Sequence, residues 1–382
     1  MRGAYYARCV PDQHIGVRRR QSRVAAGRLV PVVVAVGLVV WLLALGEPAR
    51  QTSAAPPDIT VVPSWTGPAT VDLPGVLADG AGYTPRLYVN AQTSVGVALG
   101  GDGSVRVIVA NASGTFSELR RHDAGRQVQV NGFATDGDTL VWMETSAESG
   151  RVVNALWRAT WSVTGPPIQI TTNTGEVRFH GVQADLLVAD GQVSWAAIVP
   201  EQVARTDVRS VPLTGGQVTV REVDGDLLLS TRPWAVSLPG GPGSPATLLN
   251  LATDERVDVE SEPDEAVFCD PTWCRVSVTG EAALVAIDVM HPDGSDRRRI
   301  AGPEATPTIG DATLLDRFVP LTTDLADGVG LSLHDLQTGR TDLIAREAAN
   351  VQGRGGILWW STGVGATLVW HALDLTQLGQ SR

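Results

Sequence analysis

Lysine is missing from this 382-residue chain, in which all 30 basic residues are arginines. Together with abundant Ala, Gly and Val, this composition indicates a GC-rich, actinobacterial-type bacterial genome. The acidic residues number 41, so the formal charge is −11 at pH 7. Residues 1–28 hold seven arginines and one acid, which leaves 23 arginines against 40 acids, or −17, on residues 29–382. Residues 29–382 are therefore strongly acidic and contain no basic stripe. This argues against nucleic-acid binding, which needs concentrated positive charge.

Common catalytic signatures are missing as well. The sequence contains no G-x-S-x-G, no H-E-x-x-H, no Walker loop and no G-x-G-x-x-G that opens a helix. Its six histidines are scattered singly, whereas a metal site needs several converging ligands. We therefore predict no catalytic, cofactor-binding or metal-ligating residues and no cofactor. Of the two functions considered, we favour a binding protein over an enzyme.

A single long uncharged run lies near the N-terminus. Residues 29–46, LVPVVVAVGLVVWLLALG, would span about 27 Å as a helix, close to the roughly 30 Å hydrocarbon core of a bilayer. Arginines cluster at residues 18–28, and the positive-inside rule keeps such a cluster cytoplasmic. The sequence thus predicts a basic cytoplasmic tail at 1–28, a single transmembrane helix at 29–46 and an extracytoplasmic C-terminal part. A cleaved signal peptide is the alternative, favoured by the small residues at 52–55 but not by the length of the run.

Cysteine is scarce, and its placement agrees with export. Cys9 lies in the tail, while Cys269 and Cys274 bracket the turn-forming tetrapeptide DPTW at 270–273. Such a turn can bring two sulfurs together, so we predict a Cys269–Cys274 disulfide, with a pair of free buried thiols as the alternative. Residues 47–64 are rich in Pro, Ala, Ser and Thr and are typical of an extended linker.

From residue 65 to residue 382 one unit recurs: a short apolar strand, a polar turn and a second strand. The first and last centres lie at 97 and 358, so six intervals average about 44 residues, as in propeller repeats. We predict an all-β propeller of seven blades, or alternatively six, closed by a strand from residues 58–90 such as Ile59–Val62 or Arg86–Val89. The expected first strands centre on VGVAL (95–99), TLVWM (139–143), QVSWAA (192–197), DLLLS (226–230), CRVSV (274–278), TLLDRFV (313–319) and GILWW (356–360).

Two of these units resemble a known family. The segment VAIDVMHPDGSDRRRI (285–300) resembles the strand and D-G-S-x-x-R-R turn of the TolB-like, WD-repeat-like β-propeller repeat, and LSLHDLQTGRTDLI (331–344) is a looser match. The resemblance is specific over these two segments and architectural elsewhere. It implies an extracytoplasmic propeller that binds other proteins through one face.

We therefore expect a membrane-anchored propeller that acts as a scaffold for an envelope protein or a cell-wall component. The alternative is an extracytoplasmic hydrolase or lyase with its site in the propeller channel. Asp, Glu or His side chains clustered at one channel mouth would favour that alternative. Tryptophans such as Trp142, Trp195 and Trp359 lie in expected strands, which favours packing between blades over stacking on sugars.

Overall fold

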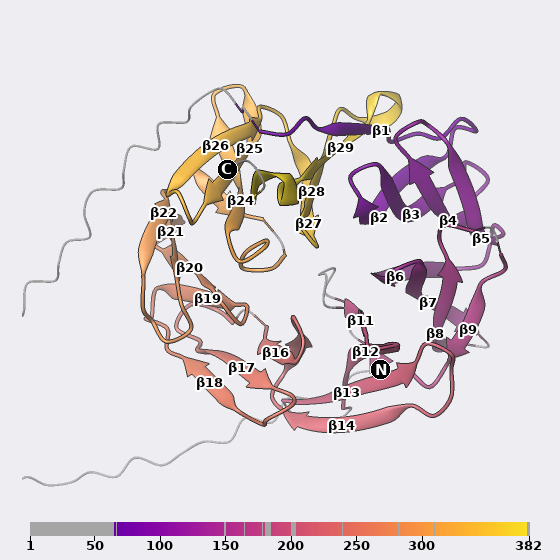
Figure 1. Ribbon diagram of the computed structural model, residues 1–382, viewed down its shortest axis with the longest axis horizontal. Helices are drawn as coiled ribbons and strands as arrows, with labels where there is room; N and C mark the ends of the chain where they lie inside the picture. Colours follow the sequence, from indigo (N-terminus) through magenta and orange to yellow (C-terminus); the bar gives the residue numbers. More distant parts are fainter. Residues whose placement is uncertain are drawn as a thin grey trace, which may run out of the picture. The chain divides into compact units, whose positions relative to one another are not determined.

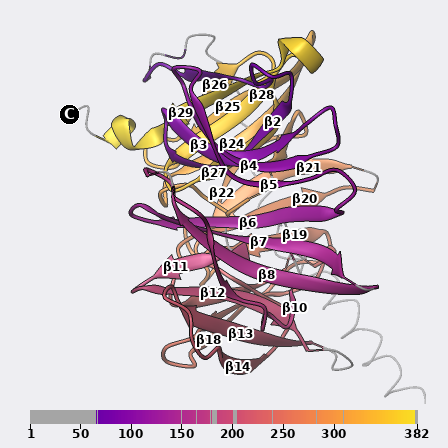
Figure 2. The ribbon, with the colours of Figure 1, turned by 90° about the vertical axis from the view of Figure 1, so that its right-hand side faces the viewer.

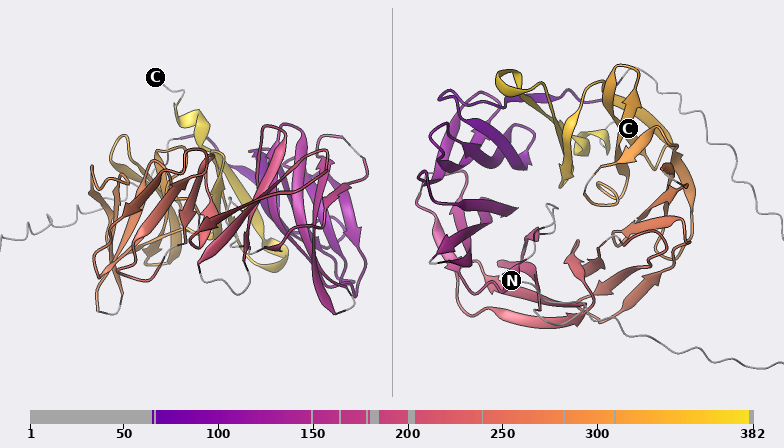
Figure 3. Two further views of the ribbon diagram at one scale, coloured as in Figure 1. Left: turned by 90° about the horizontal axis from the view of Figure 1, so that it is seen from below. Right: turned by 180° about the vertical axis from the view of Figure 1, so that it is seen from behind.

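In the computed structural model, the described part of the chain comprises residues 65 and 67–379, without 149, 164, 178, 180–184, 200–203, 239, 282 and 309. Its 29 strands form seven antiparallel sheets. The sheets stand around a central axis as the blades of a propeller (Figure 1). Figure 2 and Figure 3 show from the side that the blades twist as they run along this axis. The prediction of an all-β propeller with seven blades is confirmed.

Blades are numbered along the chain, and the strands of each are given from the axis outward. Blade 1 holds β2 (Gly82–Asn90), β3 (Thr93–Leu99), β4 (Val105–Asn111) and β5 (Phe116–His122). Blade 2 holds β6 (Val128–Asp136), β7 (Thr139–Glu148), β8 (Arg151–Thr160) and β9 (Ile168–Thr171). Blade 3 holds β10 (Glu176–Val177) and β11 (Leu187–Ala189), which both pair with β12 (Gln192–Ile198), then β13 (Arg205–Pro212) and β14 (Thr219–Asp224).

The remaining four blades repeat this order. Blade 4 holds β15 (Leu227–Leu229), β16 (Trp234–Ser237), β17 (Ala246–Asn250) and β18 (Arg256–Val259). Blade 5 holds β19 (Glu265–Cys269), β20 (Cys274–Thr279), β21 (Leu284–Met290) and β22 (Arg298–Ala301). Blade 6 holds β23 (Ala305–Pro307), β24 (Phe318–Leu325), β25 (Gly328–Asp335) and β26 (Arg340–Ala345). Blade 7 holds β27 (Ala349–Arg354), β28 (Ile357–Thr362), β29 (Val369–Asp374) and β1 (Val71–Pro74), with short 3-10 helices η2 (Gly365–Thr367) and η3 (Leu375–Gly379).

The middle strands are buried on both faces. Along β7, Leu140 and Trp142 pack toward blade 1, whereas Val141 and Met143 pack toward blade 3. Because successive side chains of a strand point to opposite faces, one strand serves both neighbours and its sequence becomes a continuous apolar run. Trp195 and the other tryptophans of such strands pack between blades, as expected.

Most predicted first strands are in fact the second strands of the blades. The segments 95–99, 139–143, 192–197, 274–278 and 356–360 lie in β3, β7, β12, β20 and β28. Two placements were wrong: 226–230 covers the inner strand β15, and 313–319 is mainly the loop before β24. The inner strands escaped notice because β15 and β23 have only three residues each, too few for an apolar pattern.

The ring closes through β1, which pairs antiparallel with β29 from Val71↔Ala372 to Pro74↔Val369. A closing strand from residues 58–90 was expected, and β1 falls in that range. Of the two suggested segments, Arg86–Val89 lies inside β2 of blade 1, and Ile59–Val62 lies outside the described residues. Trp370 of β29 also donates its indole N–H to the Tyr83 carbonyl of blade 1, at 3.0 Å.

The propeller has two ends. We call the connector face the end where each blade leads to the next, through residues 75–81, 123–127, 172–175, 225–226, 260–264, 302–304 and 346–348. We call the turn face the opposite end, where first and second strands meet at residues 91–92, 137–138, 190–191, 230–233, 270–273, 310–317 and 355–356. The closing strand β1 runs from the turn face toward the connector face, because it is antiparallel to β29.

The tail at 1–28, the apolar run at 29–46 and the linker at 47–64 lie outside the described residues. Neither of the helices in the described part is long and apolar enough to cross a membrane. On the turn face of blade 5, Cys269 and Cys274 are joined in the disulfide that the sequence led us to expect. They face each other directly in the β19–β20 register.

Candidate functional site between blades 1 and 2

A polar pocket of about 730 Å³ opens between blades 1 and 2, toward the connector face. Alternation along β5 turns Arg120 and His122 toward blade 2, and alternation along β7 turns Glu144 and Ser146 toward blade 1. The loop between the two blades completes the wall. The lining consists of Arg120, His122, Gly125, Arg126, Gln127, Val128, Glu144, Ser146, Ala147, Val153, Ala155, Trp157, Gln169 and Thr172.

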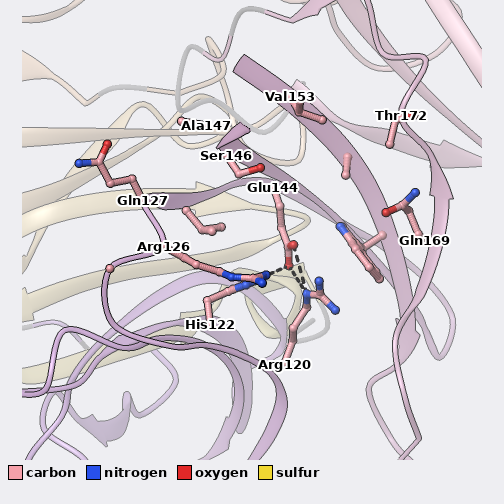
Figure 4. A pocket seen from close by; sticks show the side chains of 14 residues that line it. Arg120, His122, Arg126, Gln127, Glu144, Ser146, Ala147, Val153, Gln169 and Thr172 are labelled. Carbon is pink, nitrogen blue, oxygen red and sulfur yellow. Dashed lines mark hydrogen bonds and ion pairs between the residues drawn. The ribbon is translucent and has the colours of Figure 1, made fainter. Parts of the chain in front are cut away.

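A buried carboxylate lies at the base of the pocket. Glu144 is only 5% exposed, and its Oε1 lies 2.8 Å from Arg120 Nε and 3.1 Å from His122 Nε2. The indole N–H of Trp142 donates to the same oxygen at 3.0 Å. Since an unpaired buried charge costs several kcal/mol, Arg120 is the group that makes an ionised Glu144 tolerable there. Figure 4 shows the Arg120 and His122 side chains converging on the Glu144 carboxylate.

The Arg120 side chain is held on a second side. Its guanidinium carbon lies 3.6 Å from the ring centroid of Trp157, a cation–π contact that fixes the plane of the group. Both contacts of Arg120 with Glu144 use Nε. Within the described residues, its two Nη groups make no hydrogen bond and stay available to a ligand.

Two further nitrogen atoms of the lining are buried without a hydrogen bond to any described residue. These are the indole nitrogen of Trp157 and Nε2 of His122, whose contact with Glu144 is close but poorly aligned. Buried polar atoms in proteins are almost always hydrogen-bonded, so such orphans are informative. Both residues line the pocket, but the two nitrogen atoms themselves are shielded from solvent.

Arg126 adds a positive charge at the rim. It belongs to the loop from β5 to β6. The residue before it, Gly125, has φ +89°, a conformation that suits glycine. Figure 4 shows the Arg126 side chain extending toward Glu144, with Gln127 and Gln169 on opposite sides of the pocket. The Arg126 guanidinium has no ion-pair partner among the described residues. Since Arg120 already neutralises Glu144, the lining carries an excess positive charge.

The sequence did not identify this site. Glu144 is a charged residue in an apolar strand, and alternation alone places it on the buried face with Trp142. Its partner Arg120 lies 24 positions earlier in another blade, so only the packing of two repeats brings them together. As for metals, no three His, Cys, Asp or Glu residues in the described part are grouped so that they could hold an ion.

The arginine run at 297–299 is largely engaged in ion pairs within blade 5. Arg297 lies 2.6 Å from Glu265 and 2.9 Å from Asp288, and Arg299 lies 2.9 Å from Asp288. The two carboxylates hold the pKa of Arg297 above its usual range. These ion pairs neutralise buried acids of blade 5, much as Arg120 neutralises Glu144.

A second pocket, of about 440 Å³, lies on the turn face between blades 4, 5, 6 and 7. Asp270, Asp311 and Asp316 line it together with Arg354. Burial raises the pKa of Asp270, which accepts hydrogen bonds from the N–H groups of Thr272 and Trp273 and from Thr313. Asp270 therefore holds the turn 270–273 in place, whatever else the pocket does.

No family model matches the sequence, and no curated protein matches it significantly. Solved structures do resemble it in fold. The β-propeller domain of the Trilobed protease from Pyrococcus furiosus, which has an open velcro topology, is 10% identical, with 65% of this chain and 81% of that domain covered and a TM-score of 0.43. A putative TolB from Agrobacterium tumefaciens is 12% identical, with 60% and 83% covered and a TM-score of 0.37. An oligogalacturonate lyase in complex with manganese is 12% identical, with 81% and 98% covered and a TM-score of 0.49. These likenesses concern the propeller fold alone.

Proposed function

We propose that the chain is a membrane-anchored, extracytoplasmic binding module whose ligand site is the pocket between blades 1 and 2. The observation that carries the proposal is the convergence of unused donors on one open volume. The Nη groups of Arg120 and the guanidinium of Arg126 belong to residues that line the 730 Å³ pocket, and they make no hydrogen bond or ion pair with the described residues. A ligand that brings acceptor groups to these donors is stabilised there, since hydrogen bonds from guanidinium groups are among the strong ones.

The anchor in this proposal is the apolar run at 29–46, with the arginine-rich residues 1–28 in the cytoplasm. The linker at 47–64 leads to β1, which starts at the turn face, so the chain joins the propeller at the end opposite to the pocket. The partner is an envelope protein or a cell-wall component, presented to the rigid rim of the propeller.

The test is a cross-linked pull-down of the full chain from the envelope of the source cell. Ala155 lines the pocket, so the variant Ala155→Trp fills it. Val163 is 63% exposed and lies between β8 and β9, near the turn face, so Val163→Trp is a matched control. We expect the specific partner to be lost from Ala155→Trp and retained by Val163→Trp. Equal recovery by the two variants would show that the pocket is not the binding site.

A second candidate function is an extracytoplasmic hydrolase or lyase acting at the turn-face pocket. The specific observation in its favour is that Asp311 and Asp316 gather with Asp270 in this pocket. Asp316 has φ +51°, a conformation that asparagine tolerates well, so Asp316→Asn removes its charge with little strain. A hydrolase or lyase activity that Asp316→Asn abolishes and Ala155→Trp leaves intact would favour this candidate over the binding module.

A further inference from the structure

We infer that the pocket between blades 1 and 2 recognises a hydroxylated anion, a small molecule with one carboxylate or phosphate group and several hydroxyls. The inference rests on the proposed function, because it names the class of ligand for that same pocket. It follows from which hydrogen-bonding groups are already used in the lining and which are still open.

The open groups at the base are donors. The Nη groups of Arg120 only donate, and so does the guanidinium of Arg126 at the rim. The one acidic group in the lining, Glu144, is matched by Arg120 and accepts from Trp142. A ligand must therefore bring acceptors, and an anionic acceptor gains the charge-assisted hydrogen bonds that guanidinium groups form best.

The sides of the pocket are chemically different from its base. Gln127 and Gln169 carry amides, and Ser146 and Thr172 carry hydroxyls, all of which both donate and accept. Hydroxyl groups are the ligand feature that matches such walls. The volume of about 730 Å³ falls within the range of small-molecule sites, roughly 300–1,000 Å³.

A cationic ligand fits the lining poorly. It would meet Arg126 at the rim and find Glu144 already neutralised by Arg120. The formal charge of −17 on residues 29–382 repels anions at long range, but solvent ions screen it beyond about 8 Å at physiological salt. Recognition of an anion must therefore come from the lining itself.

Isothermal titration of the full-length chain in detergent micelles tests this inference with two matched pairs of probes. Gluconate is compared with the neutral sorbitol, and glycerol 3-phosphate with the neutral glycerol. Arg126→Gln removes the rim charge from a loop side chain without ion-pair partners. Arg151→Gln is the matched control, since Arg151 is an exposed arginine at the start of β8 and lies outside the pocket lining.

We expect one anion to bind at least about ten-fold more tightly than its neutral counterpart. Arg126→Gln should weaken it about ten-fold or more, and Arg151→Gln less than about two-fold. Binding of gluconate alone identifies a carboxylate ligand, and binding of glycerol 3-phosphate alone identifies a phosphate ligand. Equal binding of the neutral partners, equal loss in the two arginine variants, or no binding of any probe would overturn the inference.

The two proposals fail in different ways. If no anion binds but the envelope partner is still lost from Ala155→Trp, the pocket is a binding site and only the ligand class is wrong. If an anion binds with the expected arginine dependence but Ala155→Trp retains the envelope partner, the anion site stands and the binding-module proposal falls.

Discussion

At the scale of single residues, the site depends on one buried carboxylate and the groups that neutralise it. Glu144 is buried on the blade 1 side of β7, and Arg120 approaches from β5. Removing one member of a buried ion pair leaves the other charge unpaired, which typically costs 3–5 kcal/mol.

We expect Glu144→Gln to lower the free energy of unfolding by about 3 kcal/mol, because Arg120 then loses its counter-ion. Urea denaturation followed by tryptophan fluorescence measures the change. Glu118→Gln is the control, because Glu118 is 38% exposed and its contacts with Arg106 and Arg121 are long, at 3.8 Å each. This substitution should lower the free energy of unfolding by less than about 0.5 kcal/mol. Equal effects would show that the Glu144 pair contributes no more than a surface contact.

His334 gives the protein a defined sensitivity to acid. Burial, with a smaller effect from Arg298, lowers the pKa of His334 from 6.5 to about 4, while Asp335 opposes the shift. Between pH 6.5 and 4 the unfolded chain binds a proton on this imidazole and the folded chain does not. The stability that the fold has above pH 6.5 is therefore lost as the pH falls from about 6.5 to 4.

The variant His334→Asn keeps a partner for Thr341, which His334 Nδ1 contacts at 2.8 Å, but it cannot titrate. Between pH 7 and pH 4.5 the native chain should therefore lose about 2 kcal/mol more stability than the variant. Parallel unfolding curves for the two proteins over this range would contradict the assignment to His334.

At the scale of strands, side-chain hydrogen bonds as well as backbone pairing hold the closing strand of the ring. His371 of β29 contacts Asp72 of β1 through Nδ1 at 2.7 Å and Thr362 of β28 through Nε2 at 2.8 Å. This chain of hydrogen bonds ties three strands of blade 7 together, including the one recruited from the start of the propeller.

Replacement of His371 by Leu removes both contacts and should loosen β1 by about 1 kcal/mol. Hydrogen exchange at the amides of Val71, Asp72 and Leu73 should then become roughly five-fold faster, whereas blades 3–5 keep their protection. His291→Gln serves as the control, because His291 stacks on Trp273 in blade 5, far along the chain from β1. Unchanged exchange in β1 would mean that the β-ladder alone holds the closing strand.

The sequence predicted the strands that are buried on both faces, because they appear as apolar runs. It missed the strands that are too short or too exposed to form such a run. β7 and β28 sit between two neighbouring blades, so both of their faces are apolar and each appears as a run such as TLVWM or GILWW. The closing strand VDLP has only four residues and a single buried side chain, Leu73, so its position had no pattern of its own. The candidate site likewise joins residues of two blades, which no spacing within one repeat reveals.

At the scale of the whole molecule, one side chain links blades that are distant in sequence. Arg354, at the end of the inner strand of blade 7, donates to the Phe133 carbonyl of blade 2 and to the Leu186 carbonyl before β11 of blade 3, the latter at 3.2 Å. Burial lowers the pKa of Arg354 to about 10. The contact braces the ring across its inner strands.

We expect Arg354→Gln to destabilise the fold by about 2 kcal/mol, because two carbonyls lose a charged donor inside the ring. Thermal unfolding measures the loss. Arg340→Gln should have little effect, since Arg340 is 63% exposed and pairs with Asp342 at the surface. If the two variants unfold at the same temperature, the cross-ring contact does not contribute to stability.

The central claim is that the pocket between blades 1 and 2 is where the protein meets its partner. The most direct measurement places a photo-reactive amino acid at Gln169, in the lining, and separately at Val163, outside it. Irradiating cells that carry each full-length variant should cross-link an envelope component from position 169 and not from position 163. A cross-link from position 163 alone would contradict the claim and direct attention to the turn face.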